Sequence, residues 1–176
     1  MSSLKLYIIR LFVLFIPETR GFSIKRFLYR WAGAKIGENV RICSSAIILG
    51  SGKLKIGSNT WVGQNVMLLA SKEIEIGKNV DIGPKVYIGN GTHVIEPNSE
   101  RIAGKGKSIK IIIGNGTWLG VNSTILPGVV VGDKVVVGAG SLVNTKLESY
   151  TVAVGSPAKA IKIWDVKTQN WIPCKR

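Results

Sequence analysis

Residues 76–94 read IGKNVDIGPKVYIGNGTHV, and an aliphatic residue returns at every sixth position of this stretch. A six-residue period fits neither an α-helix nor the alternation of a hairpin strand. It is typical of the hexapeptide repeat of a parallel β-helix. The same spacing covers most of the chain, with sixteen aliphatic positions in register: Ile36, Ile42, Ile48, Ile56, Val62, Leu68, Ile76, Ile82, Ile88, Val94, Ile113, Leu119, Ile125, Val131, Val137 and Val143.

Each hexapeptide is expected to supply one short strand and one corner, so that three of them form a triangular coil. The aliphatic residue points inward and stacks on its equivalent in the next coil, and a small or β-branched residue four positions later also faces inward, as at Thr92. Gly follows the aliphatic residue at ten positions, where we expect it to adopt backbone angles that a β-carbon disfavours: Gly37, Gly57, Gly63, Gly77, Gly83, Gly89, Gly114, Gly120, Gly132 and Gly138.

Interruptions of the period predict the rest of the organisation. The spacing of eight after Ile48 and Leu68 indicates two-residue corner insertions, and the wider gap after Val94 predicts an extruded loop over residues 95–110. The sequence therefore predicts an all-β protein built on a parallel β-helix over residues 36–158. Residues 1–35 are expected to be helical, and residues 159–176 to form a basic tail.

The formal charge of +14 is concentrated near the two ends of the chain. Nucleic acid, an anionic membrane, phosphate-bearing ligands or solubility alone explain such an excess. A nucleic-acid partner is not expected, because the repeat lacks interleaved aromatic and basic residues. Cys43 and Cys174 share no zinc-ligand spacing with His93, the only histidine, so no metal site is expected. Two distant cysteines also favour a reduced, cytoplasmic setting.

The N-terminal segment is strongly apolar. Residues 4–16 read LKLYIIRLFVLFI, which is shorter than the ~20 apolar residues that span a bilayer and has no small-residue cleavage site. FSIKRFLYRWAGAKIG follows at residues 22–37. We expect two short helices, and two roles remain open for residues 1–31. They lie peripherally on the inner face of the cell membrane, or they cap the first coil of the β-helix.

From Ile76 to Ile161 the chain resembles the hexapeptide-repeat acyltransferases, in IGKNVDIGPKVYIGNGTH, IIIGNGTWLGVNSTILPGVVVGDKVVVGAGSLV and AVGSPAKAIK. It is similar to the galactoside and maltose O-acetyltransferases and to those of colanic acid, capsule and O-antigen synthesis. The lead-in WAGAKIGENVRI is more like the polysaccharide branch. The resemblance implies a left-handed β-helix, a homotrimer, acetyl-CoA as acyl donor and a carbohydrate acceptor in bacterial surface-polysaccharide synthesis.

The resemblance places the catalytic base of this family on His93. A sugar hydroxyl is a weak nucleophile, and an imidazole suits its deprotonation because the unperturbed pKa of this group lies close to neutral pH. Many relatives have Asp directly after this histidine, whereas this chain has Val94. The group that orients His93 therefore stays open between a backbone carbonyl and Glu96.

The resemblance also implies two sets of binding residues. Lys159 and Lys162 would meet the CoA phosphates, although by themselves they would pass for a solvated tail. The pantetheine arm would be lined by Trp118, Gly120, Val121, Ala139, Gly140, Ser141 and Asn144. The acceptor is expected near Trp61, Asn65, Ser71 and Glu96. Gly63 and Ser71 occupy places where galactoside enzymes carry sugar-binding residues, so a galactoside acceptor is not favoured.

Four other functions are compatible with the fold or with its chemistry to different degrees. An antibiotic acetyltransferase and a sugar N-acetyltransferase share the logic of His93 and CoA, and both remain open. A structural β-helix would not need an interrupted coil beside a lone histidine. A carbonic anhydrase of the same fold needs three zinc-binding histidines, and this chain has one.

Overall fold

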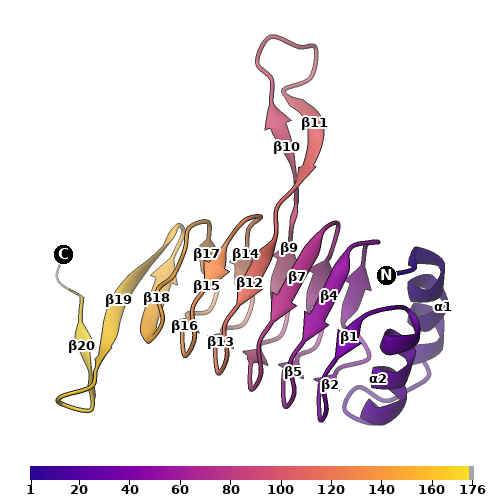
Figure 1. The fold of residues 1–176 in the computed structure, drawn as a ribbon, viewed down its shortest axis with the longest axis horizontal. Coiled ribbons are helices and arrows are strands. Elements are labelled where there is room, and N and C mark those ends of the chain that lie inside the picture. The colour runs from indigo at the N-terminus through magenta and orange to yellow at the C-terminus, as the bar shows by residue number, and fades with distance from the viewer. Residues whose placement is uncertain (175–176) are drawn as a thin grey trace.

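The computed structural model describes residues 1–174 and shows a triangular parallel β-helix with a helical cap at one end and a long arm at its side (Figure 1). The cap consists of α1 (Ser3–Val13) and α2 (Phe22–Trp31). The C-terminal strands lie at the opposite end of the β-helix from the cap. The predicted left-handed parallel β-helix with N-terminal helices is confirmed.

Three sheets form the faces of the β-helix. Sheet A contains β1 (Lys35–Ile36), β4 (Lys53–Ile56), β7 (Glu73–Ile76), β12 (Ile111–Ile113) and β15 (Val130–Val131). Sheet B begins with β2 (Arg41–Ile42), β5 (Trp61–Val62), β8 (Asp81–Ile82), β13 (Trp118–Leu119) and β16 (Val136–Val137). Sheet C contains β3 (Ile47–Leu49), β6 (Met67–Leu69), β9 (Tyr87–Gly89), β14 (Thr124–Ile125) and β17 (Leu142–Val143).

Inward aliphatic residues stack from coil to coil and form the core. Along sheet A, Ile36 pairs in register with Ile56, Ile56 with Ile76, and Ile76 with Ile113. Fifteen of the sixteen predicted positions are buried. Removal of this continuous apolar column from water is the main stabilising term, at about 25 cal/mol per Å² of buried apolar surface.

Val94 is the exception among the sixteen, and the predicted inward positions of both Val94 and Thr92 are wrong. The Val94 side chain is 40% exposed, and Thr92 is exposed as well. Both residues lie on β10 (Gly91–Ile95), which has already left the coil. The six-residue spacing continues through Val94 by sequence alone, while the chain departs from the β-helix at Gly91.

The repeat glycines are required by the close approach of neighbouring coils. A β-carbon on Gly57 would lie 2.5 Å from the carbonyl carbon of Gly77, which is far inside van der Waals contact. The expectation that these glycines adopt special backbone angles is wrong, because the left-handed angles occur two residues later. Most of the non-glycine residues with these left-handed angles are Asn or Lys, such as Asn59 (φ 61°) and Lys85 (φ 60°).

The arm is an antiparallel hairpin of β10 and β11 (Ala103–Ser108) that projects away from the β-helix (Figure 1). It leaves the corner between sheets C and A, after β9 and before β12. The predicted loop over residues 95–110 is thus an ordered excursion that begins at Gly91, four residues before the predicted start.

The C-terminal segment extends sheet B instead of forming a tail. β18 (Thr151–Gly155) joins β16 in parallel, and β19 (Ala158–Asp165) and β20 (Asn170–Pro173) then add to it antiparallel. Alternating apolar residues, including Ile161 and Ile163, give this stretch the pattern of a strand. Residues 175–176 of the predicted tail lie outside the described part of the chain.

Both helices pack one side against the first coil. Leu6, Ile9 and Val13 of α1 are buried, and Lys25 and Tyr29 of α2 are buried as well. Within residues 1–174, neither helix is long and apolar enough to cross a membrane. The cap covers the open edge of the first coil, as one of the two interpretations of residues 1–31 expects.

Candidate active site

Asn90 anchors the arm to the β-helix. Its side chain is fully buried, and its Oδ1 accepts hydrogen bonds from the backbone N–H groups of Ser71 (2.8 Å) and Lys72 (3.2 Å). Its Nδ2 donates to the carbonyl oxygen of Glu73 at 3.0 Å, and its own carbonyl accepts from the N–H of Ile109 at 2.9 Å. One side chain therefore ties the departing strand to the corner of the preceding coil.

His93 stands near the base of this arm with an exposed side chain. Its Nδ1 lies 2.9 Å from the carbonyl oxygen of Gly104 on the opposite strand. A carbonyl oxygen only accepts hydrogen bonds, so Nδ1 carries the proton and donates it. In the neutral ring the lone pair then resides on Nε2, which is the state that a general base requires.

A backbone carbonyl, and not Glu96, thus makes the observed hydrogen bond with the His93 ring. The Glu96 carboxylate covers the backbone of Gly104, where any β-carbon would overlap it. The backbone N–H of Glu96 donates to the carbonyl oxygen of Ile102 at 3.0 Å and closes the arm beyond the histidine. Glycine at position 104 therefore allows one strand to present its carbonyl to His93 beneath the carboxylate.

Two of the four predicted acceptor residues lie on the arm or at its base, and the other two lie elsewhere on the β-helix. Ser71 lies at the base of the arm, with its Oγ 3.3 Å from where a β-carbon of Gly91 would be. Glu96 lies on the arm itself. Trp61 is on sheet B, where Phe22 contacts its ring edge-to-face at 6.1 Å and the Arg41 guanidinium lies 5.1 Å above it. Asn65 is at the corner between sheets B and C.

Most of the predicted pantetheine-lining residues gather at the corner between sheets B and C. Trp118 is 56% exposed and Val121 is 44% exposed. The N–H of Gly140 donates to the carbonyl oxygen of Val121 at 2.9 Å, so the two corners stack directly. Ala139 and Gly140 are exposed, and Gly140 has open space around its α-carbon. Gly120 is buried, where a β-carbon would meet the backbone of the next coil.

Ser141 and Asn144 are not part of this exposed corner. The Ser141 side chain is buried, and its Oγ accepts a hydrogen bond from the backbone N–H of Gly155 at 3.1 Å. Its side chain therefore faces the interior instead of a bound chain. Asn144 is exposed at the end of β17, on the corner between sheets C and A from which the arm also leaves.

Both predicted phosphate-binding lysines are exposed on β19. Lys159 borders a hollow of about 680 Å³ with Pro157, Ile161, Pro173 and Cys174. Lys162 lies opposite Val152 on one side and Pro173 on the other. The hollow has an apolar wall and one cationic group at its edge.

Within one chain, His93 and the predicted CoA-binding residues lie on different parts of the β-helix. His93 projects from the corner between sheets C and A, whereas Trp118 and Gly140 mark the corner between sheets B and C, and the lysines extend sheet B. The triangular cross-section separates the corners by one full face. Within one chain, His93 and the corner of Trp118 and Gly140 therefore do not form one site.

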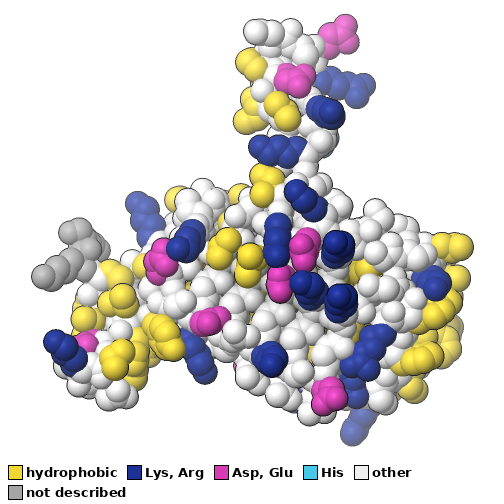
Figure 2. Space-filling view, viewed as in Figure 1, with side chains coloured by type: hydrophobic (Ala, Val, Ile, Leu, Met, Phe, Trp, Pro, Cys, Tyr) yellow, Lys and Arg dark blue, Asp and Glu magenta, His cyan; other side chains and the backbone are white. Residues whose placement is uncertain are grey.

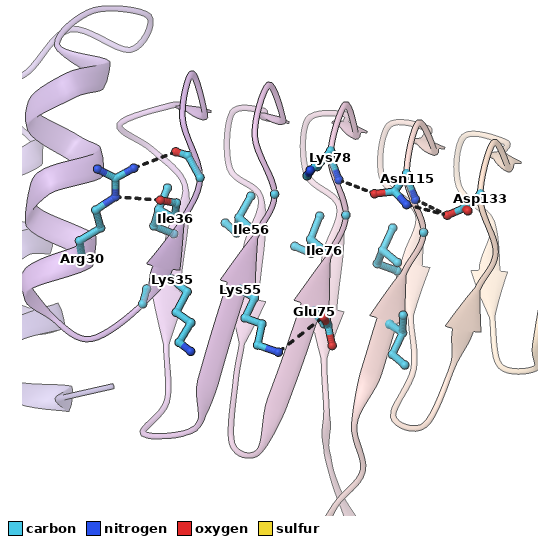
Figure 3. A pocket seen from close by; sticks show the side chains of 17 residues that line it. Arg30, Lys35, Ile36, Lys55, Ile56, Glu75, Ile76, Lys78, Asn115 and Asp133 are labelled. Carbon is cyan, nitrogen blue, oxygen red and sulfur yellow. Dashed lines mark hydrogen bonds and ion pairs between the residues drawn. The ribbon is translucent and has the colours of Figure 1, made fainter.

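A different groove runs along sheet A and its corner with sheet B (Figure 3). It is about 660 Å³ in volume, and two of its charged side chains form ion pairs: Glu75 contacts Lys55 at 3.5 Å and Lys110 at 2.7 Å. At the other edge, Asn115 Nδ2 donates to Asp133 at 3.2 Å. The stacked glycines leave this groove open, and its lining holds none of the predicted catalytic or CoA-binding residues.

Asn90 is the residue at the candidate site that sequence reasoning missed. It is the middle residue of Gly89-Asn90-Gly91, immediately before the chain leaves the β-helix. An Asn between two glycines is a turn signal, and the break in the six-residue period right after it marks a junction. Within residues 1–174, no group of three or more His, Cys, Asp or Glu side chains is arranged to hold a metal ion.

Comparisons with known proteins agree with this architecture. A family model described as bacterial transferase hexapeptide (six repeats) matches residues 110–145. WbbJ of Escherichia coli strain K12, named as a lipopolysaccharide biosynthesis O-acetyl transferase, is 45% identical over 65 residues, covering 37% of this chain and 33% of that protein. A probable macrolide acetyltransferase of Lysinibacillus sphaericus is 40% identical over 74 residues, covering 42% of this chain and 39% of that protein.

Among solved structures, AntD, an N-acyltransferase from Bacillus cereus in complex with dTDP and 3-hydroxybutyryl-CoA, superposes with a TM-score of 0.65 at 29% identity. The match covers 77% of this chain and 74% of that chain. The chain spans between a third and two fifths of the length of the two curated relatives. Fold, repeat and relatives together define a hexapeptide-repeat β-helix protein. Over residues 110–145 the chain carries the bacterial transferase hexapeptide repeat, and its sequence is similar to proteins named as acetyltransferases.

Proposed function

We propose that this protein is an acetyl-CoA-dependent O-acetyltransferase that modifies a sugar hydroxyl during bacterial surface-polysaccharide synthesis. The observation that carries the proposal is the contact between His93 Nδ1 and the carbonyl oxygen of Gly104, which leaves Nε2 as a proton acceptor. The kinship with an O-acetyl transferase named for lipopolysaccharide biosynthesis supports the choice of acceptor.

The proposed step is a direct acetyl transfer. Nε2 of His93 removes the proton from the acceptor hydroxyl as its oxygen attacks the thioester carbonyl carbon. The new C–O bond replaces the C–S bond, and the imidazolium returns the proton to the departing thiolate of CoA. Atoms and charge balance without a covalent enzyme intermediate, and an N–H donor near the carbonyl oxygen would stabilise the oxyanion.

The placement of the other groups supports a homotrimer. His93 of one copy and the corner of Trp118, Val121 and Gly140 of the next would enclose the pantetheine arm between them. Lys159 and Lys162 would then meet the CoA phosphates by charge-assisted contacts. The carbohydrate acceptor would approach the base of the arm, near Ser71 and Glu96, at the inner face of the cell membrane.

The proposal is tested by measuring CoA release from acetyl-CoA with a panel of acceptors, which includes nucleotide sugars, lipid-linked saccharides and finished polysaccharide. We expect release that depends on one saccharide class and that His93→Ala abolishes. The matched control is Asn98→Ala, at the exposed tip of the same arm, which should retain the activity. Equal release by His93→Ala and the wild-type protein would contradict the proposal.

An antibiotic acetyltransferase is the second candidate, because 74 residues are 40% identical to a probable macrolide acetyltransferase. The same chemistry of His93 would serve a macrolide hydroxyl. The likeness to AntD, which has also been solved with dTDP-4-amino-4,6-dideoxyglucose, keeps an amino-sugar acceptor open as well. Including a macrolide and an amino sugar in the panel distinguishes these two acceptors from a polysaccharide sugar. The acceptor with the highest kcat/KM identifies the reaction. Its product shows whether oxygen or nitrogen carries the acetyl group.

A further inference from the structure

The outer side of the helical cap exposes an unusual amount of apolar surface. Helix α1 buries Leu6, Ile9 and Val13 against the β-helix, yet its opposite side is apolar too. A large exposed apolar area is normally a contact site for protein or membrane. Here the outer side is open, and its exposed residues are Leu4, Tyr7, Ile8, Leu11 and Phe12, followed beyond the helix end by Leu14 and Phe15, which is 88% exposed.

Helix α2 continues the same surface. Ile24, Phe27 and Trp31 are spaced three and four residues apart, which puts them on one side of the helix, and all three are exposed. Ile8 and Phe12 of α1 meet Phe27 and Trp31 in an apolar groove between the helices. The ten exposed side chains on and beside the two helices therefore form one continuous area, called here the cap surface. In Figure 2, hydrophobic side chains gather over this end of the molecule.

Basic groups surround the cap surface. Residues 1–41 contain eight Lys and Arg side chains against two Glu. Lys5 lies 4.5 Å from the centre of the Trp31 ring and donates to the carbonyl oxygen of Trp31 at 3.2 Å, which holds an ammonium group at the edge of the apolar area. Arg10 and Arg20 are exposed on the same segment. Figure 2 shows Lys and Arg side chains beside the hydrophobic ones.

We infer that the cap surface binds the interface of an anionic phospholipid bilayer. The exposed Phe, Leu and Ile side chains enter the boundary between headgroups and acyl chains, Tyr7 and Trp31 lie at headgroup level, and Lys5 and Arg10 meet lipid phosphates. A basic residue near an anionic membrane contributes about 1 kcal/mol, and buried apolar area adds to this. A second copy of the chain fits less well, because pairing two cap surfaces would bring the same excess of basic groups together.

This orientation sets the height of the histidine above the membrane. The arm leaves the third coil, which is two strand spacings of about 4.8 Å from the first coil. A helix about 10 Å across separates the first coil from the lipid. His93 would then stand roughly 20 Å above the headgroups. This consequence rests on the proposed function: it favours a saccharide displayed on a lipid carrier over a sugar held at the lipid surface.

The experiment mixes the full-length protein with vesicles of phosphatidylcholine and phosphatidylglycerol, or of phosphatidylcholine alone, and measures co-flotation. We expect binding to the anionic vesicles that weakens as salt is added. The double variant Phe15→Glu, Phe27→Glu should bind roughly tenfold or more weakly, because both side chains are exposed and their loss leaves the core intact. Val166→Glu, at the far end of the molecule and 73% exposed, is the matched control and should bind normally.

Three outcomes would overturn the inference. One is equal flotation of the wild-type protein and the double variant, and another is equal binding to both kinds of vesicle. The third is self-association in sedimentation velocity that the double variant abolishes without any vesicle binding, which would assign the surface to contacts between copies. CoA release with a soluble acceptor should be unchanged in the double variant. Failure of the proposed reaction would thus appear in the enzyme assay and leave the flotation result as it is.

Discussion

The Nδ1 atom of His93 lies 2.9 Å from the carbonyl oxygen of Gly104 on the neighbouring strand of the arm. The sequence left open whether a carbonyl or Glu96 orients this ring. The contact with a backbone carbonyl fixes the tautomer without any acidic side chain, so the replacement of the expected Asp by Val94 removes no group on which this contact depends.

Replacing His93 by Asn should separate the orientation of the side chain from its role as a base. The Asn amide group can still donate to the carbonyl oxygen of Gly104, so the arm should keep its structure. It offers no basic nitrogen, so kcat/KM for acetyl transfer should fall by about 10²–10⁴-fold. Steady-state kinetics and thermal unfolding would be measured together. A variant with nearly normal kcat/KM would show that another group takes the proton.

Replacing Glu96 by Gln should have a small effect on kcat. The Glu96 carboxylate lies over the backbone of Gly104, and the ring nitrogen of His93 contacts the carbonyl of that residue instead. We expect KM for the acceptor to change more than kcat, because the carboxylate borders the proposed acceptor site. A fall in kcat of roughly tenfold, equal to about 1.4 kcal/mol of barrier, would instead assign Glu96 to orienting the histidine.

Replacing Asn90 by Ala should loosen the arm. Two backbone N–H groups and one carbonyl would lose the side chain that pairs with them, and an unsatisfied group costs about 1–3 kcal/mol where it is shielded from water. We expect a free energy of unfolding lower by about 2–4 kcal/mol, together with faster hydrogen exchange in residues 91–108. Asn98→Ala at the arm tip is the control. Unchanged exchange in the arm of the Asn90 variant would refute this anchoring role.

Replacing Lys25 by Met should weaken the junction between cap and β-helix. The buried ammonium donates to the carbonyl oxygens of Glu18 (2.9 Å), Ile42 (3.1 Å) and Pro17 (3.4 Å), so it joins the segment between the helices to β2. Met fills the same volume but leaves these acceptors unpaired. Urea unfolding should show a loss of about 2 kcal/mol at neutral pH, whereas Lys35→Met, which is exposed, should show little change.

The stability difference between the wild-type protein and Lys25→Met should depend on pH. Burial lowers the pKa of Lys25 below its ordinary value of 10.5, and the charges of Cys43 and Glu18 oppose this shift. The native state therefore binds fewer protons than the unfolded state as the pH rises through the lowered pKa toward 10.5, and stability from this group increases over that window. The advantage of the wild-type protein over Lys25→Met should grow there. An advantage that shrinks with rising pH would mean that the lysine pKa is raised.

Replacing Lys159 and Lys162 by Ala should raise KM for acetyl-CoA and leave kcat nearly unchanged. Both ammonium groups are exposed, and each charge-assisted contact with a phosphate contributes about 1.5–3 kcal/mol at most. We expect a tenfold or larger rise in KM. Acetyl-CoA that lacks its 3′-phosphate should be less affected by the change. Equal KM values for the variant and the wild-type protein would exclude these lysines from the CoA site.

The six-residue period predicted the core well, because the inward column of a β-helix repeats with every strand. Ile82, Leu119 and Val137 are buried where the spacing puts them. It failed at Val94, where an aliphatic residue keeps the period although the backbone has turned outward. The C-terminal strands were missed for a related reason, since β19 pairs antiparallel and lies outside the repeat.

Local spacing and residue type were enough to predict the β-helix, two N-terminal helices, the place of the excursion and the single histidine beside it. The structure was needed to show that Gly104 supplies the carbonyl facing His93, that Asn90 anchors the arm, and that most candidate pantetheine residues lie on another corner. These relations depend on which backbone atoms of distant segments meet. The residue type at a position predicts whether its side chain points inward or outward, but it does not predict which backbone carbonyl a distant side chain will contact.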